Sequence, residues 1–103
     1  LVNKGDELRM LYTDDISYIS TENNHVWAFT DDGTSYPLPM TMNELEIVLN
    51  PDKFFRINRQ YIASIKGIRK INLFFSSKLI IKLKGCLDDN IVISKEKTIL
   101  LKK

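Results

Sequence analysis

Most of the chain consists of short runs in which apolar and polar side chains alternate with a period of two. That period is typical of β-strands with one face against a core and the other toward solvent. Asp31-Asp32-Gly33 separates two of these runs and predicts a β-hairpin turn, and Pro37 suits only an edge strand. The expected strands cover residues 8–12, 16–18, 25–30, 34–38, 54–57, 61–65, 68–75, 79–83 and 91–93.

One segment, TMNELEIVLNP, departs from this pattern and has the spacing of a helix. Thr41 and Glu44 have the spacing of a capping box, and Pro51 follows the end of the segment. We therefore expect a helix over about residues 42–49. Its apolar positions are Met42, Leu45, Val48 and Leu49.

The last residues, SKEKTILLKK, are compatible with a second short helix. Ser94 would be its N-cap, and Ile99 and Leu100 would face inward. The expected fold is therefore mostly β, with one short helix and a possible short C-terminal helix.

The length of 103 residues, with 44% hydrophobic residues, suffices for one compact domain over 1–103 and not for two. Cys86 has no partner for a disulfide, so a reducing compartment is expected. No apolar run approaches the roughly 20 residues that span a bilayer. Because the sequence begins at Leu1 and not at Met, we expect a fragment of a longer protein, with any sensory or membrane segment upstream.

The charges are divided unevenly along the chain. Residues 1–50 carry two basic and nine acidic side chains, a net charge of −7, and residues 51–103 carry thirteen basic and four acidic ones, a net charge of +9. A basic segment of this kind is typical of proteins that bind a polyanion, because each cation on a phosphate releases counterions. The alternative is that the two halves pair with each other in one fold.

Catalytic chemistry is scarce in this sequence. The only histidine, His25, is far in sequence from Cys86, and no phosphate-binding glycine motif is present. Asp pairs at 14–15, 31–32 and 88–89 could hold a metal ion for phosphodiester chemistry, but each lies where a turn is expected. We therefore expect a protein that is not an enzyme and that holds no metal or cofactor.

The basic residues differ in what they indicate. Lys82 and Lys84 alternate with apolar residues, as on the solvent face of a strand, and Lys78 lies in an expected turn. In contrast, polar residues that can hydrogen-bond bases and phosphates crowd together in FFRINRQYIASIKGI. The alternative for this cluster is structural, with Arg56 in an internal salt bridge and Asn58 bonding the backbone.

The sequence resembles the LytTR DNA-binding domain over nearly its whole length. The resemblance is carried by DDISYISTENNHV, by the helix and the segment after it, and by the closing motif NIVISKEKTILLKK. Within the second of these, the specific set is Phe55, Arg56, Arg59 and Tyr61, followed by Ile68. The resemblance implies elongated, stacked antiparallel sheets whose loops enter successive major grooves of bent DNA, and a dimer on paired direct repeats.

The resemblance also implies which residues contact DNA. The candidates for base contacts are His25, Asn58, Arg59 and Lys95, and those for backbone contacts are Arg56, Gln60, Lys66, Lys78 and Ser94. The sequence departs from the family pattern at Asn58, often a His, at Gln60, often a Ser, and at Ser64, often an Asn. Lys95 replaces a frequent Arg and lacks the planar fork that recognises guanine bidentately.

The leading hypothesis is a cytoplasmic, sequence-specific double-stranded DNA-binding domain of a bacterial regulator of the two-component type, preceded by a receiver or membrane sensory segment. A second hypothesis is a protein-interaction module whose basic half docks an acidic partner. A third, a metal-dependent nuclease, depends on the Asp pairs alone.

Overall fold

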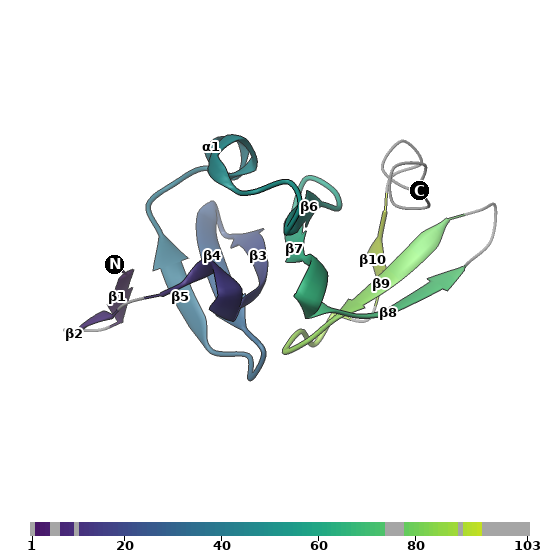
Figure 1. Cartoon of the computed structure of the whole chain (residues 1–103), viewed down its shortest axis with the longest axis horizontal. Coiled ribbons are helices and arrows are strands. Elements are labelled where there is room, and N and C mark those ends of the chain that lie inside the picture. The colour runs from purple at the N-terminus through teal and green to yellow at the C-terminus, as the bar shows by residue number, and fades with distance from the viewer. Residues whose placement is uncertain (1, 5–6, 10, 74–77, 89, 94–103) are drawn as a thin grey trace.

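The computed structural model describes residues 2–4, 7–9, 11–73, 78–88 and 90–93, and it confirms the mostly β, antiparallel fold. The molecule is elongated, with extents of 47 × 26 × 25 Å. The described strands form a two-stranded, a five-stranded and a three-stranded sheet. Figure 1 shows the paired strands β1 (Val2–Lys4) and β2 (Glu7–Arg9) and the three-stranded sheet at opposite ends of the long axis.

The central sheet has the order β5-β4-β3-β7-β6, and every pairing in it is antiparallel. The predicted hairpin is confirmed, since Gly33 has φ +85° in the turn between β4 and β5. Pro37 lies in the edge strand, as predicted, where a residue without an N–H is tolerated. The strands are β3 (Ile16–Glu22), β4 (His25–Thr30), β5 (Ser35–Leu38), β6 (Phe54–Arg56) and β7 (Tyr61–Ser64).

Helix α1 (Met42–Val48) covers one face of this sheet. The predicted capping box is confirmed, because Glu44 N donates to Thr41 Oγ1 and Thr41 N donates to Glu44 Oε1. Met42 and Leu45 are buried against the sheet. Val48, expected on the same apolar face, is 62% exposed because it lies in the last turn, where the chain leaves the sheet.

The other face of the central sheet packs on the three-stranded sheet, whose order is β10-β9-β8. Tyr18 and Tyr61 of the central sheet share a core with Ile81 and Ile91 of the second sheet, so the two sheets are stacked as expected. The three-stranded sheet consists of β8 (Ile68–Leu73), β9 (Leu79–Leu83) and β10 (Ile91–Val92). Lys82 and Lys84 point away from this core, as the alternation predicted.

The first alternating run was only partly predicted correctly. The expected strand over residues 8–12 overlaps only β2 (Glu7–Arg9), which pairs with β1 (Val2–Lys4), a strand that was not predicted. The chain then enters the 3₁₀ helix η1 (Thr13–Asp15). The expectation of a strand up to residue 12 was therefore wrong at its C-terminal end. The expected C-terminal helix lies outside the described residues. In the described part of the chain, no helix is long and apolar enough to cross a membrane.

A β-bulge at Ser17 changes which face of the sheet the side chains of β3 point to. The pairing register between β3 and β4 shifts between Ile16 and Tyr18. Two residues apart in a regular strand, these side chains would share a face, but here Ile16 joins the core under α1 and Tyr18 joins the core between the sheets. The bulge thus supplies both cores from one strand.

The two buried tyrosines of the inter-sheet core make the free energy of unfolding depend on pH in the alkaline range. Burial raises the pKa of Tyr18 well above its ordinary value of 10.0, and burial together with the hydrogen bond to Asp88 raises the pKa of Tyr61 in the same direction. A raised folded-state pKa means that the unfolded chain loses these protons first as pH rises. The stabilisation is therefore complete below pH 10 and is lost progressively above it.

We accordingly expect the free energy of unfolding, measured with urea between pH 9 and 12, to fall with increasing slope above pH 10. Tyr18→Phe should flatten that fall, whereas Tyr12→Phe, which removes an exposed tyrosine, should leave its slope unchanged. An equal fall in the Tyr18→Phe variant would show that another group is responsible.

Candidate nucleic-acid interface

Three segments that are far apart in the sequence meet at one edge of the molecule. They are the turn between β3 and β4, the loop 57–60 between β6 and β7, and the end of β10 (Figure 1). Thr21 N donates to Gln60 O at 3.1 Å, which joins the first two, and Asn58 Nδ2 donates to Val92 O at 3.1 Å, which joins the last two. We call this the loop edge.

His25 lies at the loop edge because of a two-residue turn. Asn23 and Asn24 have φ of 51° and 65°, left-handed values that Asn tolerates better than most residues, and they connect the paired residues Glu22 and His25. His25 begins β4 and is exposed. The structure thus leaves its imidazole accessible to a ligand.

The loop 57–60 is held at its base by Ile57, which is fully buried between the sheets. Asn58 Oδ1 accepts hydrogen bonds from Gln60 N and from Tyr61 N, both at 2.9 Å. These bonds close an Asx-type turn, so the alternative in which Asn58 bonds the backbone is confirmed. Arg59 and Gln60 are exposed at the tip.

Arg56 clamps this loop to helix α1. Its Nε donates to Asn58 O and its Nη2 to Arg59 O, both at 3.1 Å, while its Nη1 lies 2.7 Å from Asn43 Oδ1 and 3.1 Å from Glu46 Oε1. The Arg56 side chain is 16% exposed, and the predicted alternative of an internal ion pair is confirmed. The guanidinium therefore serves to fix the loop from which Arg59 projects.

Sequence reasoning missed the partners of this clamp. Asn43 and Glu46 are three residues apart, so they lie on the same side of α1, and this spacing is the signal that could have found them. The contact of Asn58 with the main-chain oxygen of Val92 had no such signal, since it joins residues 34 positions apart.

We expect Asn58→Ala to destabilise the domain by about 2 kcal/mol, because three hydrogen bonds of roughly 0.5–1.5 kcal/mol each are lost from a partly solvated site. Urea unfolding measures this loss. Asn58→Asp is the comparison variant, since it keeps the two accepted bonds and replaces the donation to Val92 O with a carboxylate oxygen that faces this carbonyl. It should still be more stable than the Ala variant, because the two bonds of the turn remain. An Asp variant as unstable as the Ala variant would contradict the importance of the turn.

The remaining candidates divide by position. Lys78 is exposed and precedes Leu79, whose carbonyl accepts from Ile93 N at 3.0 Å, so Lys78 lies beside the end of β10. Ser94 and Lys95 lie outside the described residues. Lys66 lies in the 3₁₀ helix η2 (Ile65–Gly67), at the far end of β7 from the loop 57–60.

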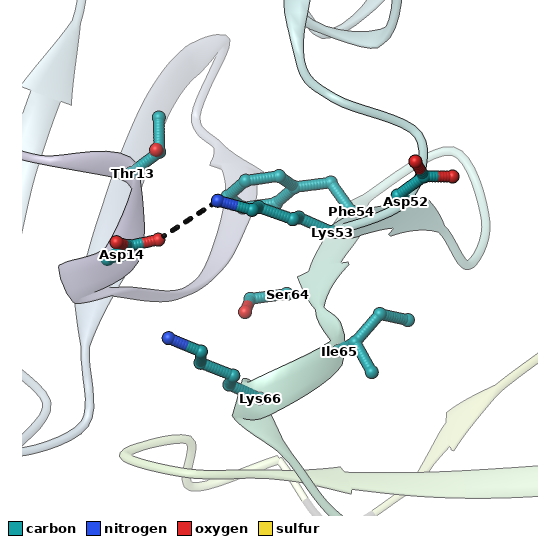
Figure 2. A pocket seen from close by; sticks show the side chains of 8 residues that line it. All are labelled: Thr13, Asp14, Asp52, Lys53, Phe54, Ser64, Ile65 and Lys66. Atoms are coloured by element: carbon teal, nitrogen blue, oxygen red, sulfur yellow. Dashed lines mark ion pairs between the residues drawn. The ribbon is translucent and has the colours of Figure 1, made fainter.

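Lys66 lines a separate pocket of about 210 Å³ between η1, the start of β6 and η2 (Figure 2). Figure 2 shows its ammonium group on the same side of the pocket as Asp14, which pairs with Lys53 at 3.5 Å. The structure therefore separates Lys66 from the loop edge.

Ion pairs between the acidic half (1–50) and the basic half (51–103) involve only some of the charged residues. Within the described part of the chain, Lys53 pairs with Asp14 and Arg56 pairs with Glu46, so two ion pairs join the halves as the alternative predicted. However, residues 53–87 contain nine basic and no acidic side chains. Arg59 at the loop edge belongs to this cationic segment.

The Asp pairs occupy different places. Asp14 and Asp15 lie in η1, Asp31 and Asp32 lie in the β4–β5 turn, and Asp88 accepts from Tyr61 Oη at 3.1 Å. Among the residues that the structure describes, no three His, Cys, Asp or Glu side chains are grouped so as to hold a metal ion.

The stacked antiparallel sheets and the loops gathered at one edge define the class of protein, a small, elongated antiparallel β domain. A family model described as the LytTr DNA-binding domain matches residues 6–103, and the chain belongs to this family. A solved LytTr DNA-binding domain of a putative methyl-accepting/DNA response regulator from Bacillus cereus has the same fold, with a TM-score of 0.81, 14% identity, and coverage of 98% of this chain and 90% of that one.

Two curated relatives are longer than this chain. Transcriptional regulatory protein YpdB of Escherichia coli (strain K12) is 30% identical over 98 residues, which are 93% of this chain and 39% of the relative. The uncharacterized response regulatory protein VC_A0850 of Vibrio cholerae is 24% identical over 80 residues, which are 75% of this chain and 31% of the relative. The chain thus spans less than two fifths of the length of these relatives.

Proposed function

We propose that this domain binds double-stranded DNA sequence-specifically as the output domain of a bacterial transcriptional regulator of the response-regulator type. The observation that carries the proposal is the loop edge, where hydrogen bonds join the end of β3, the loop 57–60 and the end of β10. His25 therefore lies on the same edge as Asn58 and Arg59, although it is far from them in the sequence. Loops spaced along one edge of an elongated domain suit successive major grooves, which present a distinct pattern for each base pair.

The residues have different roles in this proposal. Arg59 reads a base, because it is exposed at the tip of a clamped loop and its guanidinium matches the two acceptors of guanine. His25 and Lys95 make further base contacts. Asn58 keeps one N–H for a base while its other polar groups hold the loop. Gln60, Lys78 and Ser94 contact phosphates.

The relatives support the wider setting. YpdB is named a transcriptional regulatory protein and VC_A0850 a response regulatory protein, and both extend beyond the matched region. We further propose, as the family resemblance implies, that this domain acts in the cytoplasm, follows a receiver or sensory segment, and binds paired direct repeats as a dimer.

Selection from a pool of random duplexes tests the proposal. An enriched direct repeat that the domain binds at least a hundredfold more tightly than random duplex is the expected result, with affinity falling steeply as salt rises. A domain that enriches no sequence, or that binds an acidic protein partner and no duplex, would overturn it.

A further inference from the structure

The outer face of the three-stranded sheet carries cations that the loop edge does not use. Lys70 on β8 and Lys82 on β9 are register partners, so two basic side chains start from directly opposite positions on the outward face. Like charges in this position destabilise a sheet. Lys84, two residues beyond Lys82, adds a third cation to the same face.

Among the residues that the structure describes, no ion pair involves Lys70, Lys82 or Lys84. The three strands and the β8–β9 connection contain no Asp or Glu, and the nearest acids in sequence are Asp52 before them and Asp88 after β9. The described ion pairs involve Lys53 and Arg56, neither of which belongs to this sheet. A repulsive pair with no counter-charge among the described residues is suited to an anion supplied from outside.

This face is continuous with the loop edge. Val92, whose carbonyl accepts from Asn58, pairs with Ile80, and Ile80 pairs with Asn72, so one row of outward side chains crosses the sheet from the loop. Lys82 follows Ile80 by two residues along β9, a distance of about 7 Å at the rise of a strand. The cations therefore begin one step beyond the proposed base-reading loops.

We propose that the outer face of the three-stranded sheet, through Lys70, Lys82 and Lys84, binds the phosphate backbone of DNA that flanks the recognised sequence. The inference rests on the proposed function and adds to it a second contact surface, separate from the loops. Lysine suits this role because an ammonium on a flexible stem contacts phosphate as a point charge and reads no bases.

Two duplexes distinguish this surface from the loops. One carries only the selected site, and the other carries the same site with ten base pairs of arbitrary sequence at each end. Wild-type protein should bind the longer duplex at least tenfold more tightly at low salt. The variant K70Q/K82Q should lose that gain and should bind the short duplex as wild type does.

The salt dependence gives a second readout. On the longer duplex, the slope of log affinity against log salt should be lower in K70Q/K82Q by about 2, since two phosphate contacts are removed. The matched control K53Q/K66Q removes two positive charges from the pocket side and should keep the gain. K70Q/K82Q should also melt at the same or a higher temperature, because it removes a repulsive pair.

Three results would overturn this inference while the proposed function stands. The first is wild-type protein that binds both duplexes equally, and the second is a K70Q/K82Q variant that still binds the longer duplex more tightly. The third is a K53Q/K66Q control that loses this preference as K70Q/K82Q does. Absence of specific binding to either duplex would instead remove the proposed function itself, and this inference with it.

Discussion

Arg59→Ala is expected to reduce discrimination between the selected site and random duplex by about thirtyfold, since a bidentate contact with guanine contributes roughly 2 kcal/mol. The Arg59 side chain is exposed at the tip of the loop, and the main-chain oxygen of Arg59 accepts a hydrogen bond from Arg56 Nη2. Its loss should therefore affect recognition and leave the melting temperature within about 2 °C of wild type, as is usual for an exposed position. Fluorescence anisotropy with the two duplexes measures the ratio.

Two further variants separate base recognition by Arg59 from the effect of positive charge on affinity. Arg59→Lys keeps the positive charge without the planar fork, so it should preserve binding to random duplex and lose most of the discrimination. Lys66→Ala removes a cation that the structure places away from the loop edge, and discrimination should not change. If Arg59→Ala weakens binding to both duplexes equally, Arg59 is a phosphate contact and not a base reader.

Gly67→Ala is expected to destabilise the domain by about 3 kcal/mol, at the upper end of the usual cost of overpacking. A Cβ at this position would lie 2.1 Å from the carbonyl oxygen of Ser17 and 2.7 Å from its carbonyl carbon. Both are backbone atoms at the bulge, so they cannot move aside as a side-chain tip could. Thermal unfolding should show a melting temperature lower by roughly 12 °C or more.

The site is sensitive because it joins the two large sheets. Ser17 Oγ donates to Lys84 O at 2.6 Å, and Lys84 N donates to Gly67 O at 2.9 Å, so a clash at Gly67 disturbs both sheets. Gly33→Ala is the matched control, because its cost of about 1 kcal/mol arises from positive φ with the nearest atom at 3.3 Å. A Gly67→Ala variant more stable than Gly33→Ala would contradict the role of this contact.

The sequence by itself determined the local elements of this protein. The capping box of Thr41 and Glu44, the turn at Gly33 and the strand periodicity are encoded by neighbouring residues, whose backbone preferences act before any tertiary contact. The segment 54–68 likewise carried its own signature, and the charge asymmetry indicated a polyanion. These features sufficed to predict the fold class and the family.

Only the tertiary structure decided which side chains share a surface. The bulge at Ser17 sends Ile16 and Tyr18 to different cores, the contact of Asn58 with Val92 ties the loop 57–60 to β10, and the register of β8 and β9 sets Lys70 opposite Lys82. Each of these depends on pairing between residues distant in sequence, where a shift of one residue would turn every side chain to the other face. That register is determined by packing of the whole sheet, so no local pattern could have specified it.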